Sequence, residues 1–465
     1  MSTRHLALAA LCAGQLMVIL DGTIVNVALP EIQESLALSP SALGWVVNAY
    51  LIPFGGLLLL SGRLGDLFGR RRVFVAGLVL FTVASALCGL ARTPGELLAA
   101  RFAQGVGGAV TSSVTLAMVV NLFPQLPERT RAIGIYSFVQ SAGGTLGLLL
   151  GGVLTQGLGW HWIFFVNVPV GVAVTMLARR VLSPERGTGR RTADAPGAVL
   201  VTAALMLAVY AIVEHELGFG AGALALLAAF AVRQTRVADP LLPFRMFRHR
   251  TVSGALGTHA LMISGIFSFQ FLVVLYLQKV LGFDAVGTGL GVVPVSLLIG
   301  AMSLGVAPKA IARFGARSVL LAGLALISGG LGLLGFVSPD GAYVTDVLPA
   351  TVPLGIGFGL AMPALAGLAM SGASEEDSGL ASGMFNTVQQ VGASLGLAAL
   401  SSLAVSRTAG LLDAGAPVES ALTDGYRLAF RASSVLVLAA LAVAALALRA
   451  PSKTRELVTG EYRAR

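Results

Sequence analysis

Charged side chains are scarce in this chain of 465 residues, because Asp, Glu, Lys and Arg together make up only 11%. Soluble domains carry about twice that share, so this composition cannot cover a large water-exposed surface. The formal net charge of +9 does not indicate nucleic acid, because the basic residues lie in short loops between apolar runs. Lipid is therefore the expected solvent of the chain, and nucleic acid is not an expected partner.

Cysteine and histidine are also rare. The two cysteines, Cys12 and Cys88, fall inside apolar runs, so no disulfide framework is expected. The five histidines are scattered without the spacing of metal ligands, and no Walker-type glycine loop occurs. These absences disfavour a metalloenzyme and an ATP-driven pump, and they predict neither a cofactor nor a metal site.

Long hydrophobic runs are what the sequence has in abundance: hydrophobic residues make up 56% and the mean hydropathy is +0.85. A helix needs about 20 apolar residues to cross roughly 30 Å of hydrocarbon. The first run carries Asp21 and is longer than a cleavable signal, so it is expected to remain as a span. Fourteen predicted spans follow: 6–30, 43–61, 73–92, 96–122, 132–157, 162–178, 196–213, 218–232, 252–278, 286–307, 317–337, 344–371, 379–406 and 426–449.

The basic residues set the expected orientation. Cytoplasmic loops of membrane proteins collect Lys and Arg. Placing the N-terminus inside puts the basic clusters at 63–72, 179–191, 233–250 and 449–465 on the cytoplasmic side. We therefore expect a multi-pass protein of the cell membrane with both termini in the cytoplasm.

The chain contains an internal duplication. The stretch GIYSFVQSAGGTLGL (134–148) aligns without gaps on GMFNTVQQVGASLGL (383–397). At nearly the same offset, QGVGGA (104–109) resembles LGIGFG (354–359), and LFGRRR (67–72) resembles RFGARS (313–318). Transporters are commonly built from such repeats, with the binding site between them.

The duplication predicts four segments, in chain order. They are a six-helix bundle in 1–182, two extra helices with cytoplasmic linkers in 183–250, a second six-helix bundle in 251–450, and a cytoplasmic tail in 451–465.

Several motifs in order resemble the fourteen-helix drug:proton antiporter branch of the major facilitator superfamily. They are LDGTIVNVALP (20–30), GRLGDLFGRRR (62–72), LLAARFAQGVGGA (97–109), GWHWIFFVNVPVG (159–171) and DPLLPFRMFRHR (239–250). The resemblance implies an all-α integral membrane fold of two pseudo-symmetric six-helix bundles plus two central helices. It also implies transport by alternating access rather than enzymatic activity.

The fifth predicted span fits the antiporter motif of that branch through five glycines: Gly134, Gly143, Gly147, Gly151 and Gly152. Three of them repeat every four residues, which is the small-residue pattern that lets membrane helices approach closely. Leu148 stands where the motif of the branch has proline.

Asp21 and Arg101 are the candidate proton-coupling residues. At 1.5 Å per residue, Asp21 is about fifteen residues into the first span and Arg101 about five from the outer end of the fourth. Both therefore fall in the outer half of the membrane, where charged side chains are costly and rarely face lipid. We hypothesise that Asp21 carries the proton and Arg101 tunes it. A static ion pair, or capping of a helix break near Gly22, are the alternatives.

A cytoplasmic latch is predicted from the resemblance between residues 62–72 and the loop motif of the superfamily. Its residues are Gly62, Asp66, Gly69, Arg70, Arg71 and Arg72, opposite the acidic patch Glu375, Glu376 and Asp377. Asp66 is expected to meet the positive N-terminus of the helix beginning near residue 379, with the arginines facing the acidic patch. A solvated charge run that sets topology is the alternative.

Polar and aromatic residues inside apolar spans are candidates for the substrate cavity: Asn26, Gln104, Gln140, Phe267, Phe271, Asn386, Gln389 and Gln390. Phe267 and Phe271 share one helix face at i, i+4, and ordinary helix packing is the alternative explanation for both.

The predicted function is proton-coupled export of amphipathic, drug-like molecules or antibiotics by a monomer. Its partners would be that small molecule, protons and the lipid bilayer. A transporter of one dedicated metabolite with different coupling remains an alternative. A membrane-bound enzyme is the alternative of another class, although no catalytic cluster is recognisable in the sequence.

Overall fold

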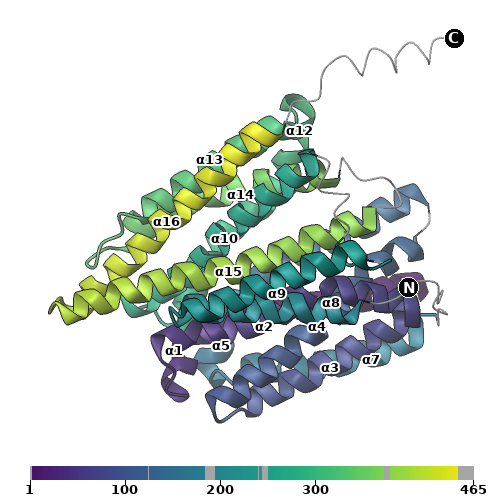
Figure 1. Ribbon diagram of the computed structural model, residues 1–465, viewed down its shortest axis with the longest axis horizontal. Coiled ribbons are helices and arrows are strands. Elements are labelled where there is room, and N and C mark those ends of the chain that lie inside the picture. The colour runs from purple at the N-terminus through teal and green to yellow at the C-terminus, as the bar shows by residue number, and fades with distance from the viewer. Residues whose placement is uncertain are drawn as a thin grey trace.

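The computed structural model describes residues 3–123, 125–183, 194–238, 240–242, 250–370 and 378–448, and within these ranges every regular element is a helix (Figure 1). The helices are α1 (Thr3–Ser35), α2 (Pro40–Phe68), α3 (Arg70–Leu90), α4 (Pro94–Leu122), α5 (Leu126–Leu158), α6 (Trp162–Phe165), α7 (Asn167–Val181), α8 (Ala195–Val213), α9 (Leu217–Arg236), α10 (Arg250–Lys279), α11 (Ala285–Ala301), α12 (Ala307–Phe314), α13 (Ala316–Leu334), α14 (Leu348–Met370), α15 (Ser378–Asp413) and α16 (Val418–Ala447). Short π-helical segments, Met302–Val306 and Tyr343–Val347, precede α12 and α14.

Thirteen spans in the described ranges are long and apolar enough to cross a membrane. They include three composite spans, in which α6 joins α7, α11 joins α12, and the second π segment joins α14. The 33-residue helix α5 completes the fourteen that the sequence predicts. The all-α, multi-span fold class is therefore confirmed.

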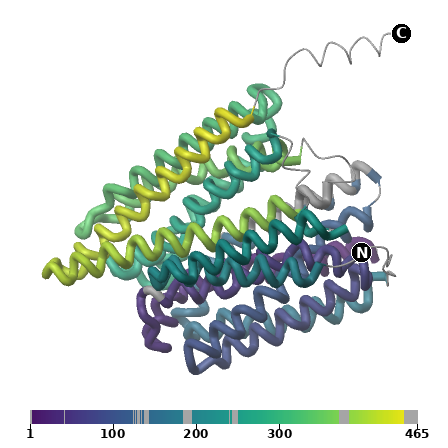
Figure 2. The backbone as a smooth tube through the Cα atoms, in the orientation of Figure 1, coloured from purple at the N-terminus to yellow at the C-terminus, as the bar shows by residue number. Residues whose placement is uncertain are grey.

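The helices form two groups and a hairpin that lies against both of them. We call α1–α7 the N half, α10–α16 the C half, and α8 with α9 the hairpin; Figure 2 traces the chain through them in that order. The terminal face is the end of the molecule where α1 begins and α16 ends, on the right in Figure 1. The opposite end is the far face.

The same glycine-containing turn between two helices occurs in both halves. Gly69 separates α2 from α3 with φ 92°, and Gly315 separates α12 from α13 with φ 81°. Both lie in the matching LFGRRR and RFGARS stretches. Because positive φ suits glycine and strains other residues, each copy keeps glycine where the chain reverses.

The halves also repeat their helix packing. A Cβ atom at Gly105 would overlap the carbonyl oxygen of Tyr50, so α4 lies directly on α2 there. In the C half, a Cβ atom at Gly355 would lie 2.9 Å from the carbonyl oxygen of Val295, where α14 meets α11. The duplicated glycines therefore hold equivalent helices at backbone contact.

Near the far face, α1 contacts α10 and α5 contacts α11 across the halves. The Gln278 amide donates to the carbonyl oxygen of Val27 (3.1 Å), and the Gln156 amide donates to Asp284 (3.0 Å). Lys279 also donates to Gln33. These bonds hold the two halves together at that face.

A second seam joins the halves along α2 and α15. The hydroxyl oxygen of Ser401 lies 3.5 Å from the Cβ position of Gly44, and the Cβ atom of Gln390 lies 2.8 Å from that of Gly55. Glycine on α2 thus allows the two antiparallel helices to approach closely over several turns.

Candidate functional site

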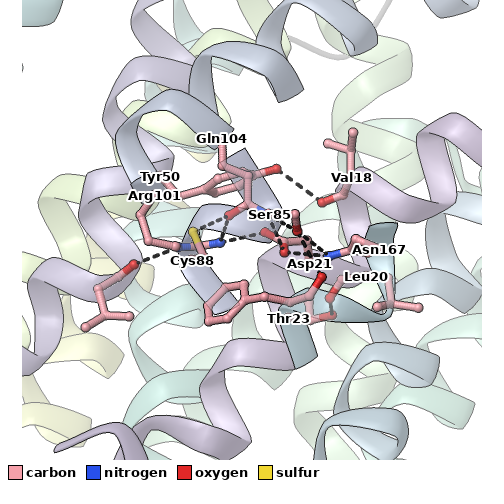
Figure 3. Close-up of polar contacts among 12 residues, drawn as sticks. Val18, Leu20, Asp21, Thr23, Tyr50, Ser85, Cys88, Arg101, Gln104 and Asn167 are labelled. Atoms are coloured by element: carbon pink, nitrogen blue, oxygen red, sulfur yellow. Dashed lines mark hydrogen bonds and ion pairs between the residues drawn. The ribbon is translucent and has the colours of Figure 1, made fainter. Parts of the chain in front are cut away.

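An ion pair lies inside the N half, with both side chains completely buried. The Nη1 atom of Arg101 on α4 lies 2.6 Å from Oδ2 of Asp21 on α1 (Figure 3). The sequence placed these two residues at similar depth, and the structure brings them into direct contact.

Two amides complete the surroundings of the Asp21 carboxylate. Gln104 Nε2 on α4 donates to Oδ1 over 2.7 Å, and Asn167 Nδ2 on α7 donates to the same atom over 3.0 Å. With Arg101, all three neighbours are donors, and an ionised carboxylate is acceptor-only. The site is therefore arranged around the deprotonated form of Asp21.

The guanidinium of Arg101 is held by more than its acidic partner. Its Nε atom donates to the carbonyl oxygen of Val46 (3.1 Å), and Nη1 also donates to Gln104 Oε1 (2.7 Å). The Cζ atom lies 4.5 Å from the ring centroid of Tyr50, which places the cation over an aromatic face. These contacts fix the arginine between α1, α2 and α4.

A serine on α3 links the amides to one another. Ser85 Oγ accepts hydrogen bonds from Gln104 (2.9 Å) and Asn167 (3.1 Å), and donates to the carbonyl oxygen of Phe164 (3.2 Å). The Tyr50 hydroxyl donates to the carbonyl oxygen of Val18 (3.1 Å). One connected network therefore ties α1, α2, α3, α4 and α7 in the core of the N half.

Sequence reasoning found only part of this network. It selected Asp21 and Arg101 as the proton-coupling pair and assigned Gln104 to the substrate cavity, whereas Gln104 bridges the pair. It gave no role to Ser85 or Asn167. The sequence signal for Asn167 was its position inside the motif-like stretch 159–171.

The C half carries no counterpart of the ion pair at the equivalent positions. A Cβ atom at Gly147 would lie 2.8 Å from the Leu20 oxygen, and Gly396 packs in the same way on Ser264, so Gly265 takes the place of Asp21. By the matching glycine repeats of α4 and α14, Thr351 takes the place of Arg101. The duplication therefore kept the fold in both halves and the charges in one.

In the predicted latch, Arg70 lies 3.4 Å from Asp66 one helical turn away. Arg71 donates instead to the carbonyl oxygen of Arg179 near the end of α7. Carbonyl groups in the last turn of a helix lack intrahelical partners and favour cations. The predicted acidic partners, Glu375, Glu376 and Asp377, lie outside the described residues.

The glycines of α5 serve two packing faces. Gly143, Gly147 and Gly151 lie on α1, and a Cβ atom at Gly151 would be 2.6 Å from the carbonyl oxygen of Ile24. Gly152 lies on α11 across the halves. Gly134 lies in the first part of the same helix.

The remaining cavity candidates differ in their surroundings. Asn26 is buried and neither amide atom has a hydrogen-bond partner, whereas Asn386 is exposed. Phe271 is buried and Phe267 half-buried. Gln389 and Gln390 are half-buried, and the side chain of Gln140 lies outside those described.

The fold and the buried charge network define a helical membrane transporter of two repeated halves. In the described residues, no group of three or more His, Cys, Asp or Glu side chains could hold a metal ion. A family model described as Major Facilitator Superfamily matches residues 11–397. The chain belongs to this superfamily.

Two curated relatives are similar over nearly their whole length. The cephamycin export protein CmcT of Amycolatopsis lactamdurans is 39% identical, with 94% of this chain and 91% of that protein covered. The puromycin resistance protein pur8 of Streptomyces alboniger is 37% identical, with 94% and 90% covered.

Among solved structures, a bacterial homologue of the human lysosomal transporter Spinster, inward-facing and unoccupied, superposes with a TM-score of 0.70. The identity is 18%, and 96% of this chain and 97% of that one are covered. This likeness supports the fold.

Proposed function

We propose that the chain exports amphipathic, drug-like molecules or antibiotics across the cell membrane in exchange for protons. In this proposal Asp21 is the proton carrier and Arg101 tunes it. The names of the two curated relatives, an antibiotic export protein and an antibiotic resistance protein, support the substrate class.

The observation that carries the coupling proposal is the complete burial of Asp21 among donors. Protonation of Asp21 would remove the charge that balances Arg101, and an unbalanced buried charge costs about 3–5 kcal/mol. Loading a proton therefore requires the network to rearrange. That requirement links the protonation state of Asp21 to the conformation of the N half.

The far-face contacts between the halves support the direction of exchange. With the terminal face in the cytoplasm, as the basic loops predict, those contacts close the outer side of the protein. The donors around Asp21 then favour its deprotonated form in an outer-closed state. That is the order expected of an antiporter that has released its proton inward.

The proposal has three further parts. Asp66 meets the N-terminus of α15 while the arginines of the loop face the acidic patch, which closes the terminal face in the opposite state. The predicted polar and aromatic residues other than Gln104 line the substrate path. The transporter works as a monomer.

Transport in liposomes tests the proposal. Purified protein is reconstituted, a pH gradient is imposed, and a panel of amphipathic antibiotics is followed. For the native protein, we expect the antibiotic to move in the direction opposite to the flow of protons. For Asp21→Asn, we expect antibiotic movement near background. Asp340→Asn is the matched control, because Asp340 is an exposed carboxylate and its loss should leave transport unchanged.

The outcomes separate the alternatives. Undiminished gradient-driven transport by Asp21→Asn, at equal protein per liposome, would remove Asp21 from the mechanism. Substrate movement that ignores the gradient in the native protein would favour the dedicated metabolite transporter with different coupling.

A further inference from the structure

The hairpin of α8 and α9 is held together as one unit at the terminal face. Asp194, which precedes α8, accepts hydrogen bonds from Arg233 Nε (2.6 Å) and Gln234 Nε2 (2.7 Å) of α9. Burial alone raises the pKa of the Asp194 carboxyl, but hydrogen bonds led by that from Arg233 outweigh it and hold the pKa below its usual value. The carboxylate therefore stays ionised and keeps the two helices together.

The hairpin is fastened to the N half along α2. A side chain at Gly56 of α2 would overlap the hydroxyl of Thr202 on α8, so the two helices touch near the middle of their length. Nearer the terminal face, Arg63 of α2 donates to the carbonyl oxygen of Pro240, which follows α9 (3.5 Å). Because two separated contacts fix it, the hairpin is expected to move with the N half.

Toward the far face, α8 also reaches the C half. One apolar cluster combines three elements: Ile52 of α2, Leu205, Val209 and Val213 of α8, and Ala398 of α15. Figure 1 shows α8 and α9 alongside α15. The hairpin therefore covers the seam where α2 and α15 join the two halves.

The turn between α8 and α9 is bonded directly to α15. His215 Nε2 lies 3.2 Å from Ser402 Oγ and 3.1 Å from Ser406 Oγ, and Ser402 Oγ also donates to the carbonyl oxygen of Ile212 (3.2 Å). The backbone of His215 has φ 57°, a left-handed conformation that, glycine aside, is found mostly in asparagine, aspartate and histidine. The ring crosses from the hairpin to the C half.

This polar contact is loosely packed. A cavity of about 280 Å³ lies beside it, lined by Val213, Glu214, His215, Ser401, Ser402, Val405, Ser406 and Ala409. Because His215 is exposed, water can replace its hydrogen bonds at small net cost. The contact is therefore suited to form and break repeatedly.

We propose that the hairpin travels with the N half and that His215 straps it to α15 only while the far face is closed. This proposal rests on the alternation between two states in the proposed function. It assigns the two extra helices a mechanical role: they stabilise the far-side-closed state, and the strap must release before the far face can open.

Crosslinking tests the strap. His215→Cys and Ser406→Cys are combined in a background whose native cysteines, Cys12 and Cys88, are replaced with alanine, and the pair is bridged with a short bifunctional thiol reagent. Bridging is expected to reduce transport at least tenfold, and a cleavable reagent should allow recovery on reduction. Full transport by the bridged protein would overturn the proposal.

The control bridge stays within the hairpin. A Cβ atom at Gly220 of α9 would lie 3.8 Å from the Cβ atom of Ala211 on α8, which is the spacing of a disulfide. Gly220→Cys with Ala211→Cys should therefore crosslink without loss of transport. If the native protein moves no substrate in the same assay, the proposed function fails instead, so the two failures are distinguishable.

A variant without crosslinks gives a second readout. His215→Asn keeps a residue that tolerates the left-handed backbone but removes the ring that reaches α15. A cysteine at Leu148, buried where α5 packs on Gly289 of α11, reports opening of the far face to an impermeant thiol reagent. Loss of the strap should raise its labelling rate about twofold to fivefold. An unchanged or lower rate would contradict the strap.

Discussion

Two kinds of buried polar residue occur in this membrane protein. Asp21 and Arg101 are fully buried, and side chains from other helices bind both of them. Asn48 is equally buried, but neither its amide nitrogen nor its amide oxygen has a hydrogen-bond partner. Since an unsatisfied buried amide destabilises the state that contains it, Asn48 should favour a conformation other than this one.

The position of Asn48 explains which conformation that is. It lies on the same face of α2 as Gly44 and Gly55, which contact Ser401 and Gln390 of α15. Opening of this seam at the far face would let water satisfy the amide. We infer that Asn48 keeps the far-side-closed state from becoming too stable.

Replacing Asn48 with leucine, whose side chain has the same number and branching of heavy atoms, tests this inference. Because the unmet amide is removed, we expect this conformation to gain about 1–3 kcal/mol, measured as a higher unfolding temperature in detergent. Asn167→Leu is the contrast, because that amide is bonded to Asp21 and Ser85 and its loss should lower the temperature. Equal destabilisation by both variants would refute the inference.

Helix ends and helix contacts were predictable from the sequence to different degrees. Thirteen of the fourteen predicted spans correspond to membrane-length apolar helices in the described residues, and α5 covers the remaining one. However, α5 begins at Leu126 rather than near 132, and α16 at Val418 rather than 426. Hydropathy marks only the part of a helix that lies in hydrocarbon. The turns that extend beyond it contain polar residues such as Glu128 and Asp424, which apolar runs cannot reveal.

Partners within the site were harder to predict. The pair of Asp21 and Arg101 could be proposed because intramembrane charges must find one another. Ser85 and Asn167 are ordinary polar residues on other helices. Only the packing of α3 and α7 against α1 and α4 brings Asn167 to the carboxylate and Ser85 to the amides beside it. The order of the helices is in the sequence, but their rotation about their own axes is not.

The glycines of α5 predict which substitutions in this helix the protein tolerates. Gly147 lies directly on Leu20 and Thr23 of α1, whereas Gly144 has no atom within 4 Å of its Cβ position. Gly147→Ala should push α1 and the adjoining Asp21 out of place and reduce transport at least tenfold. Gly144→Ala should be tolerated. Transport assays at matched expression compare the two variants. Similar activity in both variants would contradict close packing of α1 on α5.

Across the whole molecule, the two halves share a duplicated sequence pattern but differ in the buried charges. Turns, glycine contacts and helix order recur in both halves, while the charges of the site occur at the equivalent positions of the N half only. This asymmetry fits a division of labour in which the N half titrates and the C half follows it through the seams. The hairpin then adds a third element that spans one seam.

Orientation is a prediction at the scale of the whole molecule. With the terminal face in the cytoplasm, a cysteine replacing exposed Arg92, between α3 and α4, should react with an impermeant maleimide on intact cells. A cysteine replacing exposed Arg313, at the end of α12, should react only after the cells are opened. The reverse pattern would invert the direction of transport proposed here.

Proton release on substrate binding tests the central claim most directly. Purified protein in weakly buffered detergent solution is mixed with a transported antibiotic, and the change in pH is recorded. If the protonation of Asp21 is linked to substrate, the native protein should release protons and Asp21→Asn should release none while still binding the antibiotic. Equal proton release by both proteins would contradict the account.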